Sequence, residues 1–158
     1  MDASSTSPNL PHHTSYVEER ISQAGFLARS GDTRGASDLY EDVMRLLDGT
    51  DNGYLYDLIC RMGSVDGLTD VVLPACERAV ELEHDNELYR DNRGLARALT
   101  GNYAGAVEDF TFVVEFWREK DLPQYRSFIL DRETWIAELE AGRNPFDEET
   151  LNGIELGY

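Results

Sequence analysis

Apolar residues recur at helical spacing along most of the chain. Between about Ser15 and Arg29 they return every three or four positions, which indicates an amphipathic helix. The same pattern predicts helices at about 33–47, 54–62, 70–83, 86–99, 103–119 and 124–141, and a short helix after Asp147. We expect Thr69 to cap the helix at 70–83, and Phe146 and Leu151 to form a hydrophobic staple at the last one. Every predicted element is a helix, so the expected fold class is all-α.

Small and apolar residues also repeat over longer distances, with a period of 34 to 36 residues. The three matching sets are Ala24, Ala36, Tyr40 and Val43; Cys60, Val72, Cys76 and Ala79; and Gly94, Ala106, Phe110 and Val113. A glycine at the expected end of the first helix recurs as Gly31, Gly67 and Gly101. A single helical hairpin cannot bury its own apolar face, so a regular period predicts hairpins that stack on one another.

The stretch from Arg93 to Phe110 resembles the helix–turn–helix unit of the tetratricopeptide repeat (TPR) family. It has a small residue at Gly94, a glycine-led turn at Gly101, and Ala106 four residues before Phe110. The resemblance implies antiparallel helical hairpins stacked as a short right-handed superhelix, closed by a capping helix. The implied repeats lie at about 17–52, 53–86 and 87–120, and the capping helix at 123–141. An irregular helical bundle is the alternative.

The helical domain is expected to span residues 15–142, with a segment on each side. Residues 1–14 have little to bury and are expected to form a flexible tail. Residues 143–158 are expected to form a short helix and a tail. The stretch from Trp135 to Phe146 is similar to the tail that follows such repeats in bacterial multidomain proteins, which suggests a bacterial origin.

The strong acidic excess of the chain makes some classes of binding partner less favourable than others. The 158 residues include 31 acidic and 14 basic side chains, for a formal net charge of −17. Such an excess repels nucleic-acid phosphates and anionic membranes, so we expect no direct binding to either. A basic protein surface is a better match. The alternative is that the acidity only reflects a well-solvated helical surface.

The two cysteines fall at interior repeat positions. Cys60 and Cys76 are 16 residues apart, on adjacent helices, so a bridge between them is geometrically conceivable. We expect reduced thiols, because the chain lacks the cysteine framework of secreted domains. We find no membrane-spanning run and no secretory signal, which predicts a cytoplasmic protein.

Signatures of chemistry are missing from the sequence. It has no phosphate-binding glycine loop, no nucleophile elbow and no histidine pair at helical spacing. His12 and His13 are adjacent but lack further metal ligands at a useful spacing. We therefore expect no enzyme activity, no metal and no cofactor.

The resemblance implies where a partner would bind, because in a TPR stack the first helix of each unit lines the concave face. The positions that match are Tyr54, Asp57, Leu58, Arg61, Leu88, Asp91, Asn92 and Leu95. This mixture suits an amphipathic helix or an extended segment. The clamp that holds chaperone tails is disfavoured because Asp91 stands at one of its positions. Tyr54 and Arg61 are the first residues to test, and the alternative is that Tyr54 packs on its neighbouring helix.

A second candidate is a basic row formed by Arg90, Arg93 and Arg97. It could dock an acidic motif of a partner. The alternative is that these arginines pair with Glu and Asp side chains on adjoining helices.

The leading functional hypothesis is a small adaptor or scaffold that binds a peptide or a helix of another protein. The rival is an acidic inhibitor or immunity-type protein that masks the basic surface of a nuclease or another nucleic-acid-binding enzyme. Self-association is a third possibility.

Overall fold

The computed structural model describes residues 10–154, with side chains from Thr14 onward. These residues form eight α-helices and one 3-10 turn, and no strand occurs among them. The bounds are α1 Leu10–Arg29, α2 Thr33–Leu47, α3 Gly53–Val65, α4 Thr69–Leu82, α5 Glu87–Leu99, α6 Tyr103–Lys120, η1 Pro123–Tyr125, α7 Arg126–Glu140 and α8 Glu148–Gly153. The predicted all-α class is confirmed.

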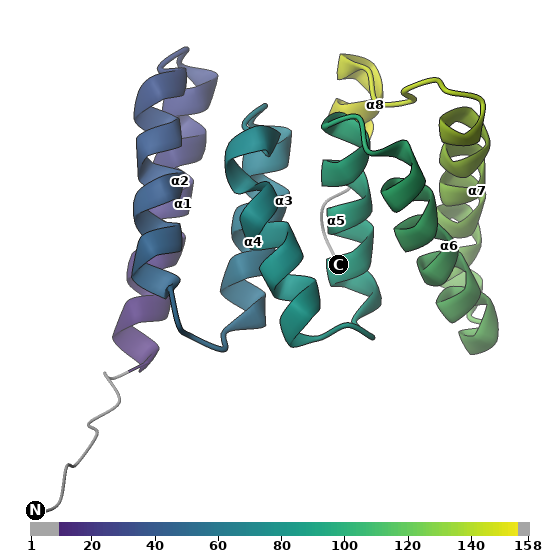
Figure 1. Ribbon diagram of the computed structural model, residues 1–158, viewed down its shortest axis with the longest axis horizontal. Helices are drawn as coiled ribbons and strands as arrows, with labels where there is room; N and C mark the ends of the chain where they lie inside the picture. Colours follow the sequence, from purple (N-terminus) through teal and green to yellow (C-terminus); the bar gives the residue numbers. More distant parts are fainter. Residues whose placement is uncertain (1–9, 155–158) are drawn as a thin grey trace, which may run out of the picture.

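The helices pack as consecutive antiparallel pairs (Figure 1). The hairpins are α1/α2, α3/α4 and α5/α6, and α7 packs on α6. Each hairpin also packs on the next one, since α3 contacts α1 and α2, and α5 contacts α3 and α4. In Figure 1, α2, α4 and α6 lie in front of α1, α3 and α7. The hairpins therefore form a row.

The turns inside the hairpins follow the sequence signals. Gly31, Gly67 and Gly101 have φ angles of +90°, +78° and +86°, which lie in the left-handed region that favours glycine. After two of these turns, Asp32 and Asn102 cap the next helix through hydrogen bonds from the amides of Gly35 and Gly105. The repeated glycines thus end the first helix of each hairpin.

One pair of buried positions recurs in every hairpin: a small residue on the first helix and a residue 16 positions later on the second helix. The three pairs are Ala24 with Tyr40, Cys60 with Cys76, and Gly94 with Phe110. In the third pair the approach is so close that a Cβ on Gly94 would lie 2.9 Å from Cε1 of Phe110. All twelve residues of the three repeated sets are buried, so the period of the sequence is a period of buried positions.

The middle pair is covalent. Cys60 and Cys76 form a disulfide between α3 and α4, and both residues are fully buried. The expectation of reduced thiols is therefore wrong. In the third hairpin, Gly94 and Phe110 face each other at the equivalent positions. Two cysteines at these positions have Cα atoms 4.8 Å apart, which is within bonding range.

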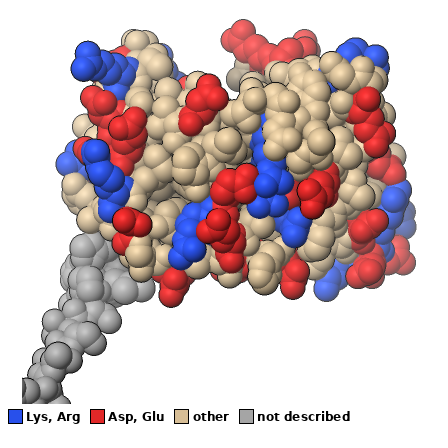
Figure 2. All heavy atoms as spheres, viewed as in Figure 1, with Lys and Arg blue, Asp and Glu red and all other residues tan. Residues whose placement is uncertain are grey.

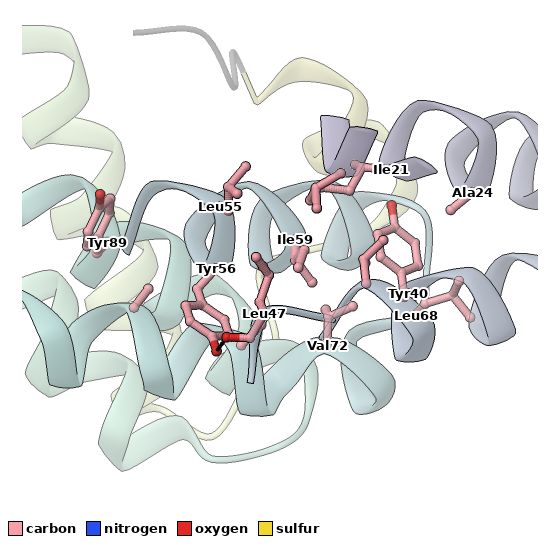
Figure 3. Packing of buried hydrophobic residues seen from close by; sticks show 14 of the residues in the cluster. Ile21, Ala24, Tyr40, Leu47, Leu55, Tyr56, Ile59, Leu68, Val72 and Tyr89 are labelled. Atoms are coloured by element: carbon pink, nitrogen blue, oxygen red, sulfur yellow. Dashed lines mark hydrogen bonds between the residues drawn. The ribbon is translucent and has the colours of Figure 1, made fainter. Parts of the chain in front are cut away.

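A continuous apolar core joins the first two hairpins (Figure 3). Ile21 of α1, Tyr40 of α2, Ile59 of α3 and Val72 of α4 point into the same space. Tyr56 is buried as well, and its hydroxyl donates to the carbonyl oxygen of Leu47 at 2.6 Å. The bond gives this phenol a polar partner in an otherwise apolar region.

The C-terminal end is held by aromatic contacts. The ring of Trp135 on α7 lies 5.5 Å from that of Phe110 and 4.9 Å from that of Phe146, measured between centroids. Leu151 packs against the same cluster as Phe146, as the staple predicts, and Asp147 caps α8. These contacts cover the apolar side of the third hairpin.

Some predicted boundaries differ from the structure. α1 begins at Leu10, so the predicted tail is wrong for residues 10–14, while residues 1–9 lie outside the described part. Thr69 is the first residue of α4 and not its cap; Leu68 stands at the cap position, without a side-chain hydrogen bond. None of the described helices combines the length and apolar character needed to cross a bilayer.

We expect the disulfide to contribute strongly to stability. Reduction should lower the free energy of unfolding by about 3 kcal/mol, because a freed loop of this length regains conformational entropy in the unfolded chain. Urea unfolding of the protein with and without dithiothreitol measures the difference. A variant carrying Cys60→Ala and Cys76→Ala is the control, since reductant should not shift its midpoint. Equal midpoints for the native protein in both conditions would contradict a bond in the folded state.

Candidate binding face on the odd-numbered helices

A row of polar side chains joins the odd-numbered helices to one another. We call this surface the odd-helix face; its polar residues are Glu18, Tyr54, Asp57, Arg61, Asp91, Asn92 and Arg132. Three bridges cross it. The Tyr54 hydroxyl donates to Oε1 of Glu18 at 3.0 Å, and Nδ2 of Asn92 donates to Oδ1 of Asp57 at 2.9 Å. Nε of Arg132 donates to Oδ1 of Asp91 at 3.0 Å, which links α5 to α7.

The central bridge contains a buried carboxyl group. Asp57 is 9% exposed, and burial raises its pKa from 3.8 to about 6. The hydrogen bond from Asn92 and the charge of Arg61 lower the pKa, whereas the charge of Asp91 raises it, and burial outweighs them all. The ionised form of Asp57 is therefore unfavourable at this buried position. It is stabilised by the hydrogen bond from Asn92 and by the charge of Arg61.

The last bridge is an ion pair surrounded by aromatic rings. Asp91 and Arg132 are both about 5% exposed, and a second guanidinium nitrogen of Arg132 also reaches Asp91. The guanidinium carbon lies 4.5 Å from the ring centre of Trp135 and 5.3 Å from that of Trp117. Asp91 thus links α5 to α7 through its ion pair with Arg132.

The eight predicted partner-binding residues divide into two groups. Asp57, Asp91, Asn92 and Leu95 are buried within the chain. Tyr54, Leu58, Arg61 and Leu88 are at least partly accessible, and Tyr54 is 49% exposed. The accessible group lies on α3 and at the start of α5. Tyr54 also contacts the neighbouring helix α1 through Glu18, as the packing alternative predicts, and its role in binding stays a prediction.

Leu95 is buried in an apolar cluster to which the C-terminal segment contributes. It belongs to a cluster with Phe110, Leu139 and Phe146, and Leu151 and Ile154 of the α8 segment pack against that cluster. The sequence predicts a short helix in this segment, but it does not predict that the helix packs on this face. Its apolar spacing, with Leu151 and Ile154 three residues apart, indicates only that the segment has a side to bury.

The basic row is paired with two acids. Asp109 of α6 is fully buried and accepts from Nη1 of Arg90 at 3.3 Å, Nη2 of Arg93 at 2.7 Å and Nη1 of Arg97 at 3.1 Å. Glu77 of α4 accepts from Nη1 of Arg93 and from Nε of Arg97, both at 3.0 Å. The pairing alternative is confirmed. The 16-residue interval from Arg93 to Asp109 matches that of the hairpin contacts, and this signal was present in the sequence.

The even-numbered helices carry charges of both signs. On the face seen in Figure 2, blue and red side chains lie next to one another and leave tan areas between them. This face has no continuous acidic surface, although the chain as a whole is strongly acidic. Among the described residues, no group of three or more His, Cys, Asp or Glu side chains is placed to hold a metal ion. The side chains of His12 and His13 lie outside the described part.

No protein-family model and no curated protein sequence matches this chain. The interpretation of the face therefore depends on its residues and their geometry.

The raised pKa of Asp57 predicts a specific pH dependence. A carboxyl whose pKa is higher in the folded state stabilises the fold most when protonated, and this contribution declines as the pH rises from about 3.8 to about 6. Asp57→Asn removes the titration and keeps an oxygen that can accept from Asn92. The free energy of unfolding of the native protein, relative to Asp57→Asn, should therefore fall by up to about 3 kcal/mol between pH 4 and pH 7.

Urea unfolding at several pH values measures this difference. Asp38→Asn, at an exposed position on α2, is the matched control: the difference in free energy of unfolding between the native protein and this variant should change little with pH. If the difference between the native protein and Asp57→Asn changed as little with pH, it would contradict the burial of an ionisable Asp57.

Proposed function

We propose that the protein is a non-enzymatic protein–protein interaction module of the TPR type, acting as an adaptor or scaffold. In this proposal the three hairpins form a short right-handed superhelix, and the odd-helix face is its concave side. The observation that carries the proposal is the recurrence of two buried residues 16 positions apart, one on each helix, in each of three hairpins repeating every 34 to 36 residues. Regular hairpin stacks of this kind provide extended binding surfaces.

The accessible part of the face favours a particular kind of ligand. Tyr54 and Leu58 lie one turn apart on α3 and offer an exposed aromatic ring beside a partly exposed aliphatic side chain. Val65 continues this surface and is 38% exposed. Such a strip, with charged groups at its margin, suits the apolar side of an amphipathic helix or an extended segment.

Rigidity would help this surface to bind. The bridges from Glu18 to Tyr54, from Asp57 to Asn92 and from Asp91 to Arg132 hold neighbouring helices together before any partner arrives. A surface ordered in advance loses less conformational entropy on association.

The acidic inhibitor remains the second proposal, and the net charge of −17 favours it. A charge-driven complex of that kind would weaken steeply with added salt, because exposed charges are screened. Apolar contacts through Tyr54 and Leu58 would resist salt. The mixed charges in Figure 2 show no acidic docking surface on the even-helix side.

The cytoplasmic location stays a prediction, and the disulfide argues against it. Disulfides are rare in reducing compartments and persist in oxidising ones. Alkylation of the protein in intact cells would show whether Cys60 and Cys76 are bonded there.

A photo-crosslinking residue at position 54 tests the proposed binding face. We expect p-benzoylphenylalanine in place of Tyr54 to capture a partner protein in the source cell, because this side chain is exposed on α3. The same residue in place of Glu41, exposed on α2, is the matched control and should capture no partner. The adduct from position 54 should persist at about 0.5 M salt, where the screening length is only a few ångströms.

The other outcomes separate the alternatives. Capture from position 41 that disappears with salt would favour the acidic inhibitor. An adduct with a second copy would indicate self-association, and capture from neither position would contradict docking on the odd-helix face.

A further inference from the structure

The short helix α8 covers part of the odd-helix face. Its residues Glu148–Gly153 follow Asp147, whose Oδ1 accepts from the amide of Thr150 at 2.8 Å. Leu151 and Ile154 are partly buried against the cluster that contains Leu95. In Figure 1, α8 lies beside the C-terminal end of α5. The chain itself thus occupies the third hairpin's share of the surface on which we propose that a partner docks.

The anchor of this segment precedes the helix. Phe146 is only 5% exposed, and its ring lies 4.9 Å from the Trp135 ring and 6.2 Å from the Phe110 ring, measured between centroids. Phe146 is therefore part of the core.

Few interactions hold α8 itself. In the described structure, the hydrogen bonds of residues 148–154 connect to one another and to Asp147, and no ion pair joins them to the rest of the chain. An open hollow of about 420 Å³ separates α8 from α7, lined by Phe128, Asp131 and Trp135 on one side and by Thr150 and Ile154 on the other. Among the described residues, Leu151 and Ile154 are the apolar side chains of this segment that pack against the stack, and Ile154 also lines the hollow.

We propose that α8 is a displaceable occupant of the odd-helix face and that its chemistry describes the partner. The partner would present an amphipathic helix with an acidic first turn and two apolar side chains three residues apart, as Glu148, Glu149, Leu151 and Ile154 do in α8. This helix would replace α8 over Leu95 and extend into the hollow beside Phe128 and Trp135. The inference rests on the proposed docking function and names the ligand class for it.

Competition within the chain gives a measurable signature. Because α8 is part of the chain, it competes with any added peptide at a high effective concentration. The apparent affinity of the native protein for a peptide copy of α8 is therefore reduced in proportion to the fraction of molecules from which α8 has moved away. Leu151→Asp with Ile154→Asp should release α8, because it places charges where apolar side chains are partly buried. Asn152→Asp adds charge at an exposed position of the same helix and should leave it in place.

The experiment is a titration of the full-length chain with a synthetic peptide of residues 147–154, followed by NMR amide shifts of Leu95, Leu99 and Trp135. The released variant should bind the peptide at least ten-fold more tightly than the native protein, and Asn152→Asp should match the native protein. A peptide in which Leu151 and Ile154 are replaced by Asp should bind none of them. Equal affinity for the native and released proteins, or no binding to the released one, would overturn the proposal.

Hydrogen exchange of the native protein provides a second measurement that needs no variant. The amides of α8 should exchange at least 100-fold faster than those of α7 if α8 leaves the face while the stack stays folded. Equal protection of the two helices would overturn the proposal. Either failure would leave the docking function intact, because that function is tested at Tyr54 on α3.

Discussion

Close packing of the two helices within each hairpin is the constraint that the three repeats share, at a pair of buried positions 16 residues apart. A small residue on the first helix lets the second helix approach, and a partner 16 positions later fills the space. The partner is Tyr40 in the first hairpin and Phe110 in the third. In the middle hairpin the contact is the disulfide between Cys60 and Cys76. Packing or a covalent bond can thus meet the same geometric requirement.

Helix spacing, the glycine turns and the repeated contacts could be predicted from the sequence because each depends on local geometry. The disulfide was not predicted because the chain lacks the cysteine framework of secreted domains, although Cys60 and Cys76 stand at the positions of Gly94 and Phe110. The bridges of Asp57 and Asp91 could not be predicted, since they depend on where a side chain of the next hairpin or of α7 points. The same holds for α8, whose apolar spacing gives a side to bury but no destination.

The odd-helix face holds the helices together, and in our proposal it also binds a partner. These two roles compete for the same residues. Asp57, Asn92 and Asp91 hold successive helices in register, and α8 covers the region around Leu95. Among the described residues of this face, the strip on α3 and the start of α5 is accessible. A partner would therefore meet a rigid, exposed strip first and gain further surface if α8 moves away. The buried charges lower stability at this face, and in return they fix the relative positions of the helices.

The equivalence of the three hairpins is the claim on which the rest depends, and a transplanted disulfide tests it most directly. Gly94→Cys combined with Phe110→Cys places cysteines at the positions that Cys60 and Cys76 occupy in the middle hairpin. Gly94→Cys with Glu108→Cys, whose side chain is exposed, serves as the control. We predict that peptide mapping of the air-oxidised protein finds a bond between positions 94 and 110, beside the native one, and none between 94 and 108. Free thiols at 94 and 110 in the folded protein would contradict a shared hairpin geometry.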